Sequence, residues 1–302
     1  MSSAASHATS SRPPASGAFG WLPIPAPLAR LFKRFPLLTY PPNQLPARCP
    51  SPRNVATLYV FLSDRDALDG LPSYNPSCLR WQTFLKLAGV EFRVVSSNNH
   101  ASPTGALPFL LPPLDPGNAA AHPPVPSNKL EQYAAERGAS KVPDVPNPKL
   151  EAYESLLDFR IRNAWLYSLY LSRPNVDLLS RLYIAPVSKS RAVRTAVLYQ
   201  LRHAAENEIL RSMGVPAVDS RTLYAGAREA FEALSIVLGL EHWFFGASGP
   251  SLFDATVFSY THLLLDDGLA WQDRRLVEIV KQFPNLVAHQ GRIWQKFWGT
   301  TR

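Results

Sequence analysis

Ser77 and Cys78 are the two side chains whose type and position could provide a nucleophile. They follow Asn75-Pro76, a typical start of a helix, because Asn caps helices well and Pro suits the first helical position. Free backbone N–H groups and the helix dipole at such a start favour a thiolate. Cys78 could instead pack the helix against a sheet, or serve as a redox-sensing thiol. The residues themselves leave these roles open.

The other reactive side chains form no catalytic or metal-binding pattern. The chain has no Gly-rich phosphate loop and no Gly-x-Ser-x-Gly nucleophile elbow. His262 and Asp266 stand four residues apart, a spacing that predicts a contact on a helix surface. None of the seven histidines pairs with another at ligand spacing, so neither a metal nor a cofactor is predicted. The histidines are His7, His100, His122, His203, His242, His262 and His289.

The net charge of +8 belongs mainly to the leading segment of the 302-residue chain. Six basic residues and no acidic residue precede Asp64, whereas the remainder has 25 basic and 23 acidic residues. A nucleic-acid-binding domain carries its basic stripe on the fold itself, so nucleic acid is not predicted as a partner. An acidic lipid surface or an acidic protein suits a basic tail better. No run approaches the roughly 18 apolar residues of a membrane-spanning helix.

Residues 1–56 are predicted to form a basic, Pro- and Ser-rich arm that is disordered or extended. Within it, residues 19–40 combine aromatic and leucine side chains with a basic cluster, while several prolines prevent a continuous helix. A partner- or membrane-binding arm, a transit peptide and a plain disordered extension all fit this composition. The candidate binding residues are Trp21, Leu22, Arg30, Leu31, Phe32, Lys33, Arg34 and Phe35.

The next part of the chain predicts a β-α-β unit followed by a third strand. Runs rich in Val, Tyr and Phe mark the strands, and Gly89 suits the exit of the helix. Pro108 at the start of the third strand suggests a cis peptide bond at Leu107–Pro108. The predicted elements are strands at 57–62, 91–96 and 105–111, helices at 75–89 and 127–138, an irregular loop at 112–126 and a linker at 141–148.

After the linker the pattern is entirely helical, so the fold class is α+β. Proline and glycine breaks separate the helices, and Ser251-Leu-Phe-Asp254 is a capping box with Asp in place of Glu. The basic residues Lys189, Arg191, Arg194 and Arg202 are interpreted as a solvated face, with a partner contact as the alternative. The predicted helices are 149–172, 174–184, 188–213, 220–239, 251–265, 272–282 and 285–298.

These segments resemble the metaxin family, whose members share the glutathione-transferase-like architecture. The resemblance covers about residues 57–298 and implies a thioredoxin-like domain at 57–140 and an all-α glutathione-transferase-like domain at 149–302. Within the family, the chain is most similar to the small fungal metaxin-like subunits of the mitochondrial sorting and assembly machinery. The matching segments are LYVFL at 58–62, NPSCLRWQTFLKLAGVEFRVVSSNN at 75–99, GALPFLLPP at 105–113, VPSNKLEQY at 125–133 and SLFDATVFSY at 251–260.

The resemblance also implies a vestigial glutathione-like site. Ser127 matches a serine that typically binds the γ-glutamyl carboxylate, but Pro126 replaces the acidic residue that usually precedes it. The insert at 112–126 stands where the fourth strand should come. We therefore expect no catalytic residue and no cofactor. The residues of this vestigial site are Ser77, Cys78, Pro108 and Ser127.

The function implied by the resemblance is that of a non-enzymatic, peripheral subunit on the cytosolic face of the mitochondrial outer membrane. It would bind the membrane-embedded barrel subunit and the larger metaxin-like subunit of the same complex. It would also bind β-barrel precursor polypeptides by their C-terminal sorting signals, at a sheet edge or a cleft and without a nucleophile. The chain ends at Arg302 without the hydrophobic anchor that the larger relative typically carries, so peripheral attachment is expected. A glutathione-dependent transferase and a soluble, dimeric structural protein are the alternatives.

Overall fold

The structure describes the helices and strands of most of the chain after residue 53. The candidate arm residues from Trp21 to Phe35 lie outside the described residues, as does most of the predicted linker. The described residues belong to one compact unit of the chain, so contacts between its two halves can be stated. The computed structural model describes residues 54–113, 123–138, 140, 142–143 and 148–299.

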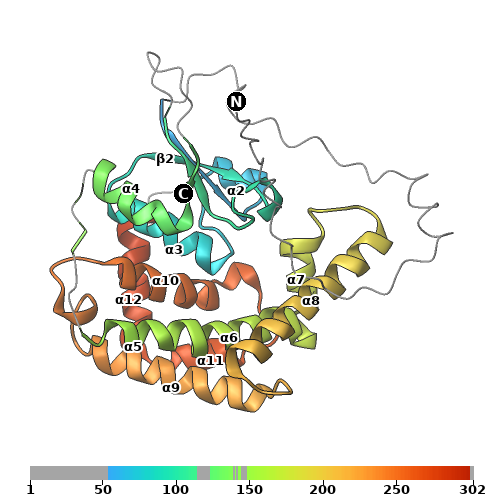
Figure 1. The fold of residues 1–302 in the computed structure, drawn as a ribbon. Helices are drawn as coiled ribbons and strands as arrows, with labels where there is room; N and C mark the ends of the chain where they lie inside the picture. Colours follow the sequence, from blue (N-terminus) through green and yellow to red (C-terminus); the bar gives the residue numbers. More distant parts are fainter. Residues whose placement is uncertain (1–53, 114–122, 139, 141, 144–147, 300–302) are drawn as a thin grey trace, which may run out of the picture. The chain divides into compact units, whose positions relative to one another are not determined.

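A four-stranded mixed sheet forms the first half, with the strand order β2-β1-β3-β4. Strand β1 (Ala56–Val60) pairs in parallel with β2 (Phe92–Ser96), and helix α3 (Pro76–Leu87) connects the two. On its other side β1 pairs antiparallel with β3 (Phe109–Leu111), which in turn pairs antiparallel with β4 (Val125–Pro126). With α4 after β4, the order of the sheet and its main helices is β-α-β-β-β-α (Figure 1), which is the predicted thioredoxin-like arrangement with a fourth strand added.

Two short elements of this half correct the sequence prediction. Strand β4 lies inside the segment 112–126 that was interpreted as an irregular insert in place of the fourth strand, so that interpretation is wrong at its end. Helix α2 (Asp64–Leu68) was not predicted, although the Ser63 hydroxyl caps it by accepting from the backbone N–H of Asp66 at 3.1 Å. A five-residue helix is too short to show a hydrophobic period. The Leu107–Pro108 peptide bond is cis, as predicted.

A short helical segment completes the first half, and further helices form the second (Figure 1). The predicted helix 149–172 is found as an unbroken run of α- and π-helical turns. The bounds are η2 (Asn99–Ala101), η3 (Ser127–Lys129), α4 (Leu130–Arg137), α5 (Leu150–Ser155), η4 (Leu156–Ile161), α6 (Arg162–Leu166), η5 (Tyr167–Leu171), η6 (Arg173–Asn175), α7 (Val176–Leu179), η7 (Ser180–Ile184), α8 (Arg191–Met213), α9 (Ser220–Leu238), η8 (Phe244–Gly246), α10 (Leu252–Leu265), η9 (Asp267–Leu269), α11 (Arg275–Lys281) and α12 (Pro284–Phe297).

Helix α10 joins the two halves. It packs along α3 of the sheet half, as Figure 1 shows, and also contacts α11 and α12. Its side chains from Phe253 to Leu264 are buried, so it is apolar around most of its circumference. Ala255 belongs to the core of the sheet half, whereas Phe258 belongs to the core of the helical half. The predicted capping box at Ser251 and Asp254 is confirmed.

No helix in the described ranges combines the length and the apolar character that crossing a membrane requires. The longest of them, α8, has only Ala205 and Ile209 buried.

Candidate functional site

The N-terminus of α3 is closed by its own cap and by a tyrosine of the helical half. The Asn75 side-chain oxygen accepts from the backbone N–H of Cys78 at 3.2 Å, and Pro76 has no N–H to offer. The amide nitrogen of Asn75 donates to the hydroxyl of Tyr183 at 3.1 Å. Two of the groups that could hold an anion at this helix start are therefore already engaged.

Cys78 lies in the core of the sheet half and is completely buried. Burial raises the pKa of its thiol to about 12, because hydrogen bonds with the Phe61 backbone and the Ser73 side chain compensate for only part of the desolvation. The thiol is therefore protonated at neutral pH, and it has no access to solvent. This is the geometry of a packing residue, not of a nucleophile or a redox sensor. Ser77, its neighbour, is exposed.

Aromatic side chains from both halves fill the space beside this helix start. The Tyr183 ring meets those of Phe61, Tyr74 and Tyr170 at centroid distances of 5.3, 5.1 and 5.9 Å. Burial raises the pKa of Tyr183 well above its ordinary value, and it raises the pKa of Tyr74 and Tyr170 in the same direction. These phenols stay protonated near neutral pH, so none of them can serve as a base for a thiol.

The other two residues of the predicted vestigial site lie at the end of the sheet where β1 finishes, since Tyr59 pairs with Phe109, and the Phe61 backbone just beyond β1 hydrogen-bonds with Cys78. Pro108 is buried directly before β3, and Ser127 follows β4. Because Phe109 is paired with Pro126 in the antiparallel ladder, Pro108 and Ser127 lie at the same end of it. The structure thus places all four predicted residues in the sheet half, with the pair 77–78 on α3 and the pair 108 and 127 at the β3–β4 ladder.

A mostly apolar groove of about 490 Å³ separates the loop before α3 from the helical half. One wall comes from the chain between β1 and α3, including Leu62, Leu71 and Tyr74. The other wall comes from η7, α10, η9 and α12, including Leu182 and Trp294. A groove of this size and lining fits the usual dimensions of a binding site for a small molecule or a few side chains. Its polar contributors are Ser63, Asp66, Arg181, His262 and Asp266.

His262, which lines this groove, was predicted to make a helix-surface contact with Asp266, and that prediction is wrong. The side chain is only 6% exposed and stacks between the rings of Phe258 and Trp294 at 5.1 and 4.7 Å. Its Nδ1 atom pairs with the amide of Gln290 at 3.1 Å. Burial lowers the pKa of His262 to about 4, against a smaller opposing effect of Asp266. The imidazole is therefore neutral at physiological pH.

Replacement of His262 by Phe should remove a pH dependence of folding. The pKa of His262 is about 4 in the folded chain and 6.5 in the unfolded chain, so the stability that its neutral form contributes is complete above pH 6.5. That contribution is lost as the pH falls toward 4, by about 3 kcal/mol. Denaturant unfolding of His262→Phe between pH 7 and pH 4 should therefore show a shallower fall than the unsubstituted chain. The exposed His203→Gln variant, as the control, should follow the unsubstituted chain; identical slopes for all three proteins would contradict the assignment.

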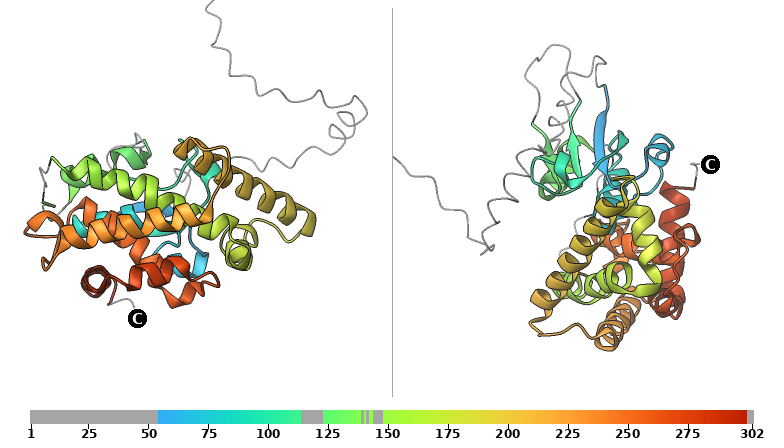
Figure 2. Two further views of the ribbon diagram at one scale, coloured as in Figure 1. Left: turned by 90° about the horizontal axis from the view of Figure 1, so that it is seen from below. Right: turned by 90° about the vertical axis from the view of Figure 1, so that its right-hand side faces the viewer.

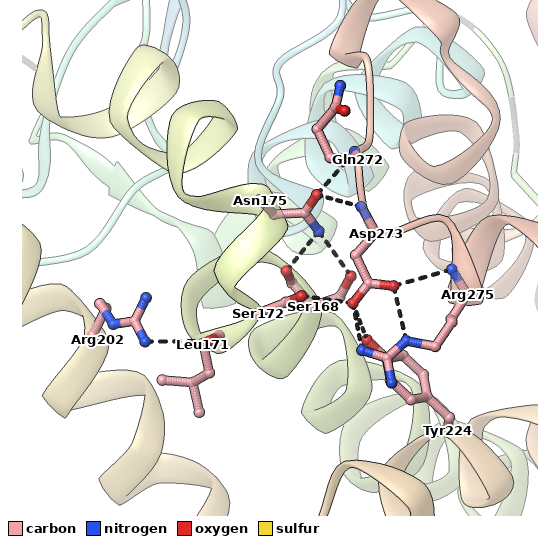
Figure 3. A network of polar contacts seen from close by, with 9 residues as sticks. All are labelled: Ser168, Leu171, Ser172, Asn175, Arg202, Tyr224, Gln272, Asp273 and Arg275. Atoms are coloured by element: carbon pink, nitrogen blue, oxygen red, sulfur yellow. Dashed lines mark hydrogen bonds and ion pairs between the residues drawn. The ribbon is translucent and has the colours of Figure 1, made fainter.

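A second polar centre surrounds the buried carboxylate of Asp273 (Figure 3). The carboxylate accepts from the Ser172 hydroxyl at 2.6 Å, from the Tyr224 hydroxyl at 3.0 Å and from two guanidinium nitrogens of Arg275 at 2.9 and 2.6 Å. Burial alone would raise the pKa of Asp273, but these hydrogen bonds outweigh it and hold the pKa well below its usual range. A carboxylate with all its positions occupied is a structural anchor and does not suit proton transfer. Sequence reasoning missed it, because its partners are up to 101 residues away.

In the described part of the chain, no group of three or more His, Cys, Asp or Glu side chains is arranged to hold a metal ion.

Comparisons with known proteins agree with this architecture. The model of the glutathione S-transferase N-terminal domain matches residues 76–175, and that of the glutathione S-transferase C-terminal domain matches residues 227–293. Metaxin-1 of Macaca fascicularis is 27% identical over 201 residues, which cover 65% of this chain and 62% of the relative. Metaxin-3 of Xenopus laevis is 27% identical over 199 residues, covering 63% of this chain and 62% of the relative. The chain thus matches less than two thirds of the length of each relative.

Among solved structures, the chain is similar to apo glutathione S-transferase III, with a TM-score of 0.44 and 17% identity over 82% of this chain and 97% of that one. The first transferase domain match begins at α3 and runs into the helical half, and the second includes α10, α11 and most of α12. The chain has a glutathione-transferase-like fold, and its similarity to the metaxins supports a place in the metaxin family.

Proposed function

We propose that this chain is a non-enzymatic, peripheral subunit of the sorting and assembly machinery on the cytosolic face of the mitochondrial outer membrane. In this role it binds the membrane-embedded barrel subunit and the larger metaxin-like subunit. It also receives β-barrel precursors through their C-terminal sorting signals. The metaxin relatives support the choice of machinery, and the geometry of the α3 N-terminus supports a role in binding and not in catalysis.

The observation that carries the proposal is the state of the position where a transferase would activate a thiol. Cys78 is buried and protonated, Asn75 is bonded to Tyr183, and the tyrosines beside it have raised pKa values. A fold that retains the transferase framework, buries Cys78 and packs aromatic side chains beside it disfavours activation of a glutathione thiolate by Cys78 or by these tyrosines. Retaining the framework without this chemistry favours a docking role.

Two features could bind an extended polypeptide. The groove between the halves is lined by Leu62, Leu71 and Leu182, which suits apolar side chains. Strand β2 has one strand neighbour in the described sheet, so its outer backbone groups face away from the ladder. Addition of a strand to such an edge gives affinity through main-chain hydrogen bonds, and nearby pockets give specificity. These are the requirements for recognising a β-strand of a precursor.

Deletion of residues 19–53, which ends before β1, should weaken retention in the membrane complex while leaving the rest of the chain folded. The arm carries basic and apolar side chains, which add a second attachment and therefore avidity. Co-purification from mitochondria in mild detergent, with the full-length and the arm-deleted chain, measures this retention. Recovery of the barrel subunit with the full-length chain and its partial loss with the deletion are expected. Absence of the barrel subunit from both preparations would contradict the proposed function, and equal recovery in both would contradict the role of the arm.

A glutathione-dependent transferase is the second candidate, favoured by the matches to both transferase domain models. It requires saturable glutathione binding and loss of activity on Ser77→Ala or Cys78→Ala. The burial of Cys78 argues against it.

A further inference from the structure

The connection between η7 and α8, together with the first residues of α8, forms an exposed projection, residues 185–196, here called the basic tip. In Figure 1 and Figure 2 the α7–α8 hairpin stands out from the neighbouring helices at this end. All residues of the basic tip are exposed except Ser188 and Arg194, which are partly buried. The buried residues of α8, Ala205 and Ile209, lie near its other end. The basic tip therefore contributes little to the core.

The charge of this region is of one sign. No acidic residue occurs between Asp177 and Glu206, a stretch that contains five arginine or lysine residues. Within the basic tip, Lys189 and Arg191 are exposed, and neither forms an ion pair with another residue of the described part of the chain. Arg194 donates only to a neutral acceptor, the backbone oxygen of Ser188, at 2.6 Å. The positive charge of the basic tip is thus not neutralised by neighbouring side chains.

The position of these charges is also unfavourable for the helix. The first turn of α8 contains Arg191 and Arg194 and no acidic residue. The N-terminal end of a helix carries partial positive charge, so cations there reduce helix stability. Residues that destabilise their own helix, without an ion pair elsewhere in the described chain to offset the cost, are typical of a functional surface.

Apolar side chains accompany the charges. Val187 and Val193 of the basic tip are 62% and 43% exposed, and Tyr199 two turns further along α8 is 69% exposed. Small apolar and tyrosine side chains next to cations suit the boundary between lipid headgroups and acyl chains. The cations are separated by Ser, Ala and Val, without a paired arrangement that would match one specific carboxylate. A surface that offers many anionic phosphates needs no such match.

We propose that the basic tip is a membrane-contact surface that binds anionic phospholipid headgroups. The binding of anionic lipid is inferred from the basic tip alone. Only the identity of the membrane rests on the proposed function. Each basic residue near an anionic bilayer increases binding about fivefold, so reversing two of them should lower binding at least tenfold.

The test is flotation of the full-length chain with phosphatidylcholine vesicles that contain phosphatidylinositol, and with vesicles of phosphatidylcholine alone. The variant Lys189→Glu/Arg191→Glu is compared with Arg211→Glu/Arg228→Glu, which changes the net charge equally at exposed positions outside the basic tip. The arm is present in every protein, so its own lipid binding contributes equally. We expect salt-sensitive flotation of the unsubstituted and control proteins with the anionic vesicles and at least a tenfold loss for the tip variant. Val187→Ser/Val193→Ser should cause a smaller loss.

Two results would overturn the proposal: flotation of the tip variant at the level of the unsubstituted chain, or an equal loss in the control variant, which would indicate an effect of net charge. The proposed function is judged separately, because co-purification of the barrel subunit depends on protein contacts. A tip variant that floats normally in a chain that still recovers the barrel subunit would overturn the lipid contact and leave the proposed function standing.

Discussion

The Asp254→Asn chain should unfold with a free energy about 3–5 kcal/mol lower than that of the unsubstituted chain, because a buried side chain loses hydrogen bonds with several partners at once. Asp254 and His289 are both fully buried, and the carboxylate meets the imidazole Nε2 at 2.8 Å. The same carboxylate accepts from the backbone N–H groups of Phe244 and Ser251 at 3.1 and 2.9 Å, and from the Ser251 hydroxyl at 2.6 Å. One side chain therefore fixes η8, the start of α10 and α12 together.

An amide in place of this carboxylate turns one acceptor into a donor that faces other donors, which leaves buried groups unpaired. Guanidinium unfolding followed by tryptophan fluorescence measures the loss. Asp219→Asn is the matched control, because Asp219 also caps a helix, α9, but is exposed there. Asn caps a helix as well as Asp, so the control should unfold almost as the unsubstituted chain does. Equal, small losses in both variants would show that the buried pair contributes little.

The Asp273→Asn chain should lose roughly 2–4 kcal/mol of stability at neutral pH. The Asp273 side chain is 4% exposed and receives hydrogen bonds from Ser172, Tyr224 and Arg275, which come from three separate elements of the helical half. Because the pKa of Asp273 is lowered in the folded chain, its contribution is present above its unfolded pKa of 3.8 and declines as the pH falls below that value. The difference between the two proteins should therefore shrink below about pH 4.

Glu278→Gln is the comparison for this prediction. Glu278 forms an exposed pair with Arg274 at 3.3 Å, and such pairs contribute little to stability. The urea unfolding midpoints of the unsubstituted chain, Asp273→Asn and Glu278→Gln at pH 7 and pH 3 distinguish a buried anchor from an exposed ion pair. A loss for Asp273→Asn that is as small as that for Glu278→Gln, or that does not change with pH, would contradict the anchoring role.

Local signals in the sequence were sufficient for most elements. Asn75-Pro76 placed the start of α3, and Ser251 with Asp254 placed the start of α10, since capping depends on residues within one turn. The cis peptide bond at Leu107–Pro108 was also predicted from local pattern. Strand β4 was missed because two residues carry no period, and its pairing with β3 is decided by the tertiary fold.

The candidate site depends on contacts that no local pattern shows. Cys78 and Asn75 were identified from the sequence, but the bond from Asn75 to Tyr183 joins residues 108 positions apart. The burial of Cys78, which sets its pKa, follows from packing of α3 against the sheet and α10. His262 was assigned to a helix surface because its neighbour Asp266 has the right spacing, whereas the ring packs between Phe258 and Trp294. Long-range packing thus determines what each of these side chains can do.

The most direct test of the central claim, that the transferase framework here has no thiol-activating site, is calorimetric titration of the full-length chain with millimolar glutathione. We predict no saturable heat, because Cys78 is buried and Asn75 with Tyr183 closes the helix start. Saturable binding that is abolished by Ser77→Ala or by Ser127→Ala would contradict the account, since it would show a functioning glutathione site at the predicted position.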